Sequence, residues 1–109
     1  MDNSDATLIF NRLEDIAAFF SEKSPGNISF RDADNYDYEI YGLFQSWQKA
    51  FPEMSFKKEF PCFDVFWEEL ASWDAQEGWT RERAERIIKL AKDALKEMKE
   101  HKELQIYKK

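Results

Sequence analysis

The chain has 109 residues, of which 43% are hydrophobic and 17% aromatic, and its formal net charge is −6. This length suits one domain, which we expect to span residues 1–109. The apolar content excludes a disordered chain. The negative charge argues against nucleic acid as a partner, because phosphate binding requires clustered Lys and Arg.

The charge is spread unevenly along the sequence. Residues 1–80 carry a net charge of −10, and residues 81–109 carry +4. An acidic body attracts basic proteins and speeds their encounter, so we expect a basic protein partner. The alternative is that the acids only keep a small domain soluble.

Cysteine content and hydropathy predict a cytoplasmic location without membrane association. The single cysteine, Cys62, allows no internal disulfide, which fits a reducing compartment. The start of the sequence lacks the basic segment and apolar run of a secretory signal. No apolar run approaches the roughly 18 residues that cross a bilayer.

The first half of the sequence predicts two amphipathic helices. The first covers residues 5–21, with Ser4 as its N-cap. The second starts near residue 34 or 35, after a polar segment rich in cap-forming residues. It ends at Phe51, because Pro52 disfavours a helical conformation in the residue before it.

The second half predicts two more helices, joined by a short turn. The third covers residues 62–77, carries an apolar stripe that includes Leu70, and has Gly78 as its C-terminal cap. The fourth begins after an N-cap at Thr80 and continues to about residue 103.

Amphipathic helices with short connections predict an all-α fold, a compact domain resembling a four-helix bundle. The alternative is an α+β fold, in which segments outside the predicted helices or at the end of the chain form short strands. The three candidate strands are Ile28–Phe30, Ser55–Phe60 and Gln105–Tyr107.

The first candidate site is the acid- and tyrosine-rich run from residue 32 to residue 41. An interface with a basic partner uses Tyr for contact area and acids to pair with Arg or Lys. The alternative is that the acids cap and begin the second helix while the tyrosines edge the core. The candidate partner-binding residues in this run are Asp32, Asp34, Tyr36, Asp37, Tyr38 and Glu39.

The second candidate site is the outer face of the third helix. At helical spacing the acids of this segment fall off the apolar stripe, and Trp73 lies partly outside it, as a binding hot spot can. The alternative is that Trp73 packs against the fourth helix or the connector at residues 53–61. The candidate partner-binding residues here are Asp64, Glu68, Trp73 and Asp74.

No motif in the sequence indicates an enzyme, a metal site or a cofactor. Carboxylate metal sites of helical bundles also need Glu-x-x-His pairs, and His101 is the only histidine. His101 falls near the end of the fourth helix, where the dipole favours a cation, so we expect its side chain in solvent. Gly-rich phosphate loops, nucleophile elbows and paired-cysteine zinc spacings are absent from the sequence.

The acid–tyrosine run Asp32–Tyr41 and the acid–tryptophan run Asp64–Trp79 carry a resemblance to a known class of proteins. In general character the whole chain resembles the small immunity proteins of bacterial toxin systems, such as those paired with contact-dependent inhibition toxins or nuclease colicins. The resemblance implies a cytosolic antitoxin, without catalytic residues, that occludes the active site of a basic nuclease.

Two other functions fit the same composition. An acidic DNA mimic encoded by a phage, which blocks a restriction or CRISPR-type nuclease, would bind several unrelated DNA-binding proteins. A structural or adaptor subunit would bury its apolar excess in a stable oligomer. An inhibitor is expected as a monomer or weak dimer, so light scattering separates it from the structural subunit.

Leu70→Ala tests the predicted orientation of the third helix. Leu70 shares a stripe with Phe63 and Phe66, so its truncation should leave a core cavity and lower the free energy of unfolding by about 2–5 kcal/mol. Chemical denaturation measures the loss. A loss below about 1 kcal/mol would mean that the stripe faces solvent.

Overall fold

The computed structural model of the protein describes residues 3–72 and 80–104, which form helices and no strand. The all-α prediction is therefore confirmed. Two strands of the alternative fold are wrong: Phe30 already begins a helix, and residues 56–59 form a helical turn. The third, Gln105–Tyr107, lies outside the described residues.

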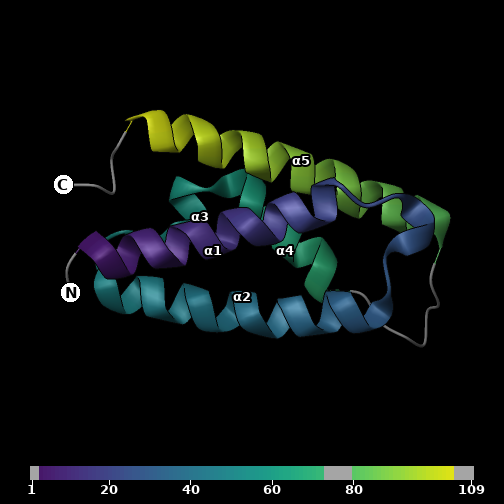
Figure 1. Ribbon diagram of the computed structural model, residues 1–109. Coiled ribbons are helices and arrows are strands. Elements are labelled where there is room, and N and C mark those ends of the chain that lie inside the picture. Colours follow the sequence, from purple (N-terminus) through teal and green to yellow (C-terminus); the bar gives the residue numbers. More distant parts are fainter. Residues whose placement is uncertain (1–2, 73–79, 105–109) are drawn as a thin grey trace.

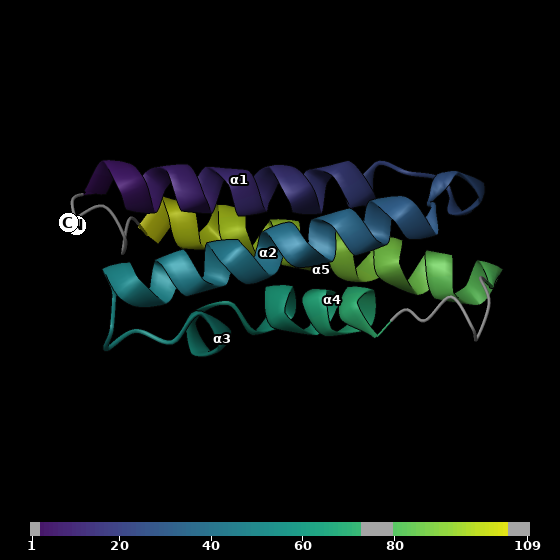
Figure 2. The same ribbon diagram turned by 90° about the horizontal axis from the view of Figure 1, so that it is seen from below.

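Four long helices pack as a bundle, with two short elements between them. The helix α2 contacts α1 on one side and α4 on the other, and α5 also contacts both α1 and α4 (Figures 1 and 2). The outer side of α2 therefore faces away from the rest of the described bundle. The elements are α1 (Asn3–Ser21), η1 (Pro25–Asn27), α2 (Phe30–Ala50), α3 (Phe56–Glu59), α4 (Pro61–Ala71) and α5 (Arg81–Leu104).

The start of α2 differs from the prediction. The helix begins at Phe30, because Ser29 is its N-cap and the Ser29 hydroxyl accepts a hydrogen bond from the backbone N–H of Asp32 at 3.1 Å. The acids at positions 32 and 34, which we took for the cap region, therefore lie inside the helix. Ser4 likewise lies inside α1, which begins at Asn3.

The connection between α4 and α5 was predicted in part. The last residue of α4 is Ala71, where we expected residue 77, and Ser72 is its C-cap. The N-cap at Thr80 is confirmed, since its hydroxyl accepts from the backbone N–H of Arg83 at 3.1 Å. The predicted cap at Gly78 lies outside the described residues.

Phe60 lies at the centre of the aromatic core. Its ring is fully buried and contacts Phe10 of α1, Trp47 of α2 and Phe56 of α3, with centroid separations of 5.8, 6.0 and 4.5 Å. The His101 ring of α5 lies 4.3 Å away. One side chain at the start of α4 thus joins four other helices, which aligns α4 against the bundle.

Burial of Phe60 leaves α4 without a local cap, and α5 supplies one. Phe60 is the N-cap residue of α4 and its side chain cannot accept a hydrogen bond. The Glu97 carboxylate of α5 instead accepts from the backbone N–H of Cys62, at 2.9 and 3.1 Å, and of Phe63, at 3.2 Å. An anion at a helix N-terminus also interacts favourably with the helix dipole.

The environment of His101 differs from the prediction. We expected the side chain in solvent, yet it is 8% exposed. Its Nε2 lies 3.3 Å from the Glu59 carboxylate, and its ring packs on Phe60. The short helix α3 and Phe60 fold over this end of α5, a contact between segments about 40 residues apart that helical spacing does not reveal.

Glu97→Ala should lower the free energy of unfolding by about 1–3 kcal/mol, because it removes a charged acceptor from two helix-terminal N–H groups. Chemical denaturation measures the loss. Glu100→Ala, on the exposed side of the same helix, is the matched control and should change stability by less than about 0.5 kcal/mol. Equal losses in both variants would mean that Glu97 does not act as the cap.

Candidate partner-binding surface

The neighbouring helices α2 and α4 are rich in acids, of which only Asp34 and Glu68 are exposed. Residues 32–48 and 61–71 together carry seven acids and no Lys or Arg. The two helices are antiparallel neighbours: Asp37 hydrogen-bonds to Trp67, and Phe44 packs against Phe63 at 5.9 Å. We call the exposed residues of these two segments the acidic flank.

Some acids of the candidate set hold the bundle together. Glu39 forms a bidentate ion pair with Arg12 of α1, in which Nη2 lies 2.8 Å from Oε1 and Nε also donates. This hydrogen bonding lowers the pKa of the Glu39 carboxyl and raises the pKa of Arg12. This ion pair joins α1 to α2. The conformation of Glu39 is therefore accounted for by a contact within the chain, without a partner protein.

Asp37 and Tyr36 also make internal contacts. The Asp37 carboxylate accepts a hydrogen bond from the indole N–H of Trp67 at 2.8 Å, which joins α2 to α4. Tyr36 is half-buried and packs against Phe19 and Phe20 of α1, with ring centroids 4.9 and 5.4 Å apart. Both residues connect α2 to a neighbouring helix.

Three other residues of the first run point outward. Asp32 is partly exposed and lies in the first turn of α2, where the helix dipole favours an acid. Asp34 is exposed, and its side chain has no hydrogen bond or ion pair with the described residues. Tyr38 is 71% exposed. The sequence run therefore divides between internal contacts and an outward face that contains Asp34 and Tyr38.

Asp64 and Glu68 lie together on α4 with one weakly held cation. The Lys57 ammonium lies 3.8 Å from the Asp64 carboxylate and 4.0 Å from that of Glu68, and its side chain is 72% exposed. Burial raises the pKa of the Asp64 carboxyl, and the neighbouring Glu68 raises it further against the opposing effect of Lys57. A negative charge on Asp64 is thus less favourable in the protein than it would be in water.

Further exposed side chains extend this surface beyond the candidate set. Tyr41, in the same sequence run, is 49% exposed, and Val65 of α4 is 47% exposed. The exposure of Val65 could have been inferred from the sequence, because at helical spacing it lies outside the apolar stripe of Phe63 and Phe66. Glu69, by contrast, is largely buried and pairs with two arginines of α5, Arg83 and Arg86. The candidates Trp73 and Asp74 lie outside the described residues.

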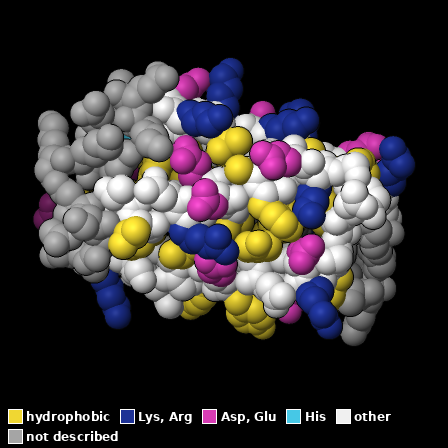
Figure 3. Space-filling view, in the orientation of Figure 1, with side chains coloured by type: hydrophobic (Ala, Val, Ile, Leu, Met, Phe, Trp, Pro, Cys, Tyr) yellow, Lys and Arg dark blue, Asp and Glu magenta, His cyan; other side chains and the backbone are white. Residues whose placement is uncertain are grey.

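The side of the molecule formed by α1 has a different charge pattern. Figure 3 shows Lys and Arg interspersed with Asp and Glu across this face, with no extended area of one sign. On α5, exposed lysines alternate with acids, as in the Lys89–Asp93 pair at 3.6 Å.

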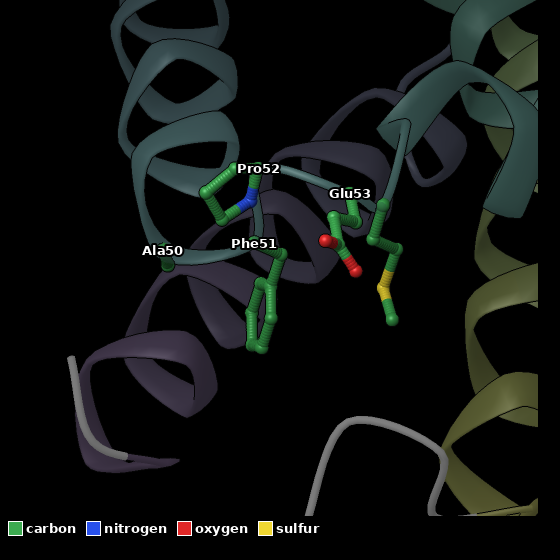
Figure 4. Close-up of a pocket in the computed structure, with 5 residues that line it drawn as sticks. Ala50, Phe51, Pro52 and Glu53 are labelled. Atoms are coloured by element: carbon green, nitrogen blue, oxygen red, sulfur yellow. The ribbon is translucent and has the colours of Figure 1, made fainter.

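A hollow of about 510 Å³ lies at the C-terminal end of α2 (Figure 4). Its lining is mainly apolar and includes Phe51, Pro52 and Met54. Glu53 contributes a carboxylate, but the lining includes no His, Cys, Lys or Arg.

Within residues 3–72 and 80–104, no helix is both long and apolar enough to cross a membrane. The described part of the chain also contains no group of three or more His, Cys, Asp or Glu that could hold a metal ion. No family model, curated protein or solved structure matches this sequence.

Alanine substitution should distinguish the internal acids of α2 from the outward ones. Asp37→Ala should lower the free energy of unfolding by about 1–2 kcal/mol, because the half-buried Trp67 indole loses a charged acceptor. Asp34→Ala, in the same helix, should change it by less than about 0.5 kcal/mol. Chemical denaturation of both variants tests this difference, which equal stabilities would contradict.

Proposed function

We propose that this protein is a binding inhibitor of a basic protein, most concretely an immunity protein that neutralises a nuclease toxin. The observation that carries the proposal is the outward face of α2, where two exposed tyrosines, Tyr38 and Tyr41, lie near the exposed acid Asp34. Tyrosine is enriched in the binding hot spots of protein interfaces.

The acidic flank has the chemistry to bind a positively charged groove. Asp34 and Glu68 are exposed, and neither has a close hydrogen-bonded cation. In the proposed complex they occupy positions that nucleic acid phosphates take in the free nuclease. The tyrosines contribute desolvated contact area, and the toxin is blocked by occlusion of its active site. This chain performs no chemical step.

The Asp64–Glu68 pair supports the proposal on energetic grounds. Asp64 is only 7% exposed, and its cation, the Lys57 ammonium, is loosely held at 3.8 Å. A cation from a partner would relieve the repulsion between the two carboxylates and satisfy the buried one. A carboxylate whose charge is disfavoured by burial and by a neighbouring acid is a candidate functional group.

Capture of a partner tests the proposal. The tagged 109-residue protein should retain one dominant basic protein from the lysate of its source cells, and the association rate of the purified partner should fall as salt rises. The double variant Tyr38→Ala/Tyr41→Ala should weaken this complex by about 100-fold or more without unfolding. Leu8→Ala, which truncates a 67% exposed side chain on α1, should leave the affinity unchanged.

Other outcomes would favour the alternative functions. Retention of several unrelated DNA-binding proteins would indicate a DNA mimic of the anti-restriction or anti-CRISPR type. Absence of a partner at low and high salt, together with a stable oligomer in light scattering, would indicate a structural or adaptor subunit. A captured basic protein that binds the double variant as tightly as the unchanged chain would exclude the outward face of α2 as its contact.

A further inference from the structure

The outward face of α2 carries a row of exposed side chains that no described element covers. The helices α1, α3 and α4 contact α2 on its other sides. Residues spaced three or four positions apart share one face of a helix, and two helices can pack along such a row. The exposed residues of α2 with this spacing are Arg31, Asp34, Tyr38, Tyr41, Gln45 and Lys49.

The charges of this row alternate in sign from one end to the other. Arg31 and Asp34 lie near the start of α2. Lys49 lies in its last turn, and the exposed acid Glu53 follows just past the helix end. These four side chains form no ion pair or hydrogen bond within the described part of the chain. A helix with only basic residues would therefore meet like charges near both ends of α2.

A second copy of α2, placed antiparallel, brings opposite charges together. In a two-fold interface, residues that lie opposite each other are equally far from the axis. Asp34 comes seven residues before Tyr41, and Lys49 comes seven residues after Gly42. An axis between Tyr41 and Gly42 therefore sets Asp34 of each copy opposite Lys49 of the other. The arginine at the start of each α2 likewise lies near the acid past the end of the other α2.

The same axis places a small residue where the two helices would be closest. Gly42 is exposed, and a Cβ built on it meets no atom within 4 Å. Because Gly42 has no side chain, Tyr41 of the second copy can pack against its backbone. Tyr38 and Gln45, each three residues from the centre, face each other in the same register. Tyr38 and Tyr41 are 71% and 49% exposed in one copy, and pairing removes part of both rings from water.

We propose that two copies of this chain pair weakly through antiparallel α2 helices, with the two-fold axis between Tyr41 and Gly42 and with Asp34 of each copy paired to Lys49 of the other. One helix from each copy buries a small area, which is typical of transient dimers. The dimer covers Tyr38 and Tyr41, so it competes with the basic partner for the same face. This competition rests on the proposed function, whereas the dimer itself does not.

Charge reversal tests the register of the dimer. Sedimentation velocity of the 109-residue chain at low salt should show a dimer that is half formed on the order of 100 μM. Asp34→Lys and Lys49→Asp should each weaken it at least about tenfold, because each sets like charges opposite each other twice. The double variant should restore the affinity to within about threefold of the unchanged chain, because its pairs are only reversed.

Two further variants separate the contact from general effects of charge and stability. Lys92→Asp changes the charge of an exposed position on α5, and it should leave the dimer unchanged. Gly42→Gln should weaken the dimer at least about tenfold, because the new side chain keeps the helices apart. It should also raise Tm by a few degrees, since glutamine is a better helix former. A loss of the dimer through unfolding would instead lower Tm.

Several results would overturn the dimer. They are a monomer at every concentration, a dimer that tolerates both single charge reversals, or a double variant no tighter than either single one. Any of these leaves the inhibitor function standing, because capture of the basic partner is measured separately. A captured partner that binds the dimer without dissociating it would exclude the competition and leave the dimer and the inhibitor function in place.

Discussion

Burial of Phe60 is the interaction on which the rest of the bundle depends. Its ring contacts α1, α2, α3 and α5 at once, so the start of α4 can occupy only one position. The same burial places an apolar side chain where α4 needs a hydrogen-bond acceptor. Glu97 of α5 supplies that acceptor through three short contacts to the backbone of α4. The packing of Phe60 in the core and the capping of α4 by Glu97 are therefore coupled, because both act on the first residues of α4.

This arrangement determines which sides of α2 and α4 remain exposed. Because α4 is held against α5 by the Glu97 cap and the Glu69 ion pairs, its other side meets α2 and carries Asp64 and Glu68. The helix α2 lies between α1 and α4, opposite α5 (Figure 2). Its outer side has no neighbour among the described elements. The outward tyrosines and acids are thus a consequence of how the four helices close around the aromatic core.

The acids of the protein serve two physically distinct purposes. Glu39, Asp37 and Glu97 each bond to a donor on another helix, where a charged acceptor strengthens the contact. Asp34 has no such donor, and Asp64 is buried beside another carboxylate. The first group stabilises the bundle, whereas Asp34 is solvated and the charge of Asp64 is disfavoured by burial. The net charge therefore does not by itself measure the binding potential of the surface.

Helical spacing alone determined the all-α class, the four long helices, the burial of Leu70 and the Thr80 cap, because these features depend on neighbours within a few residues. The start of α2 was predicted a few residues too late, since Ser29 and the acids that follow it are all good cap residues. Tertiary structure decided which acids face inward: Glu39 and Asp34 look alike in sequence, but only Glu39 lies opposite an arginine of α1. It also decided that His101 is buried and that Glu97 caps α4, because both contacts join segments 35 or more residues apart. Local periodicity carries no information about such pairs.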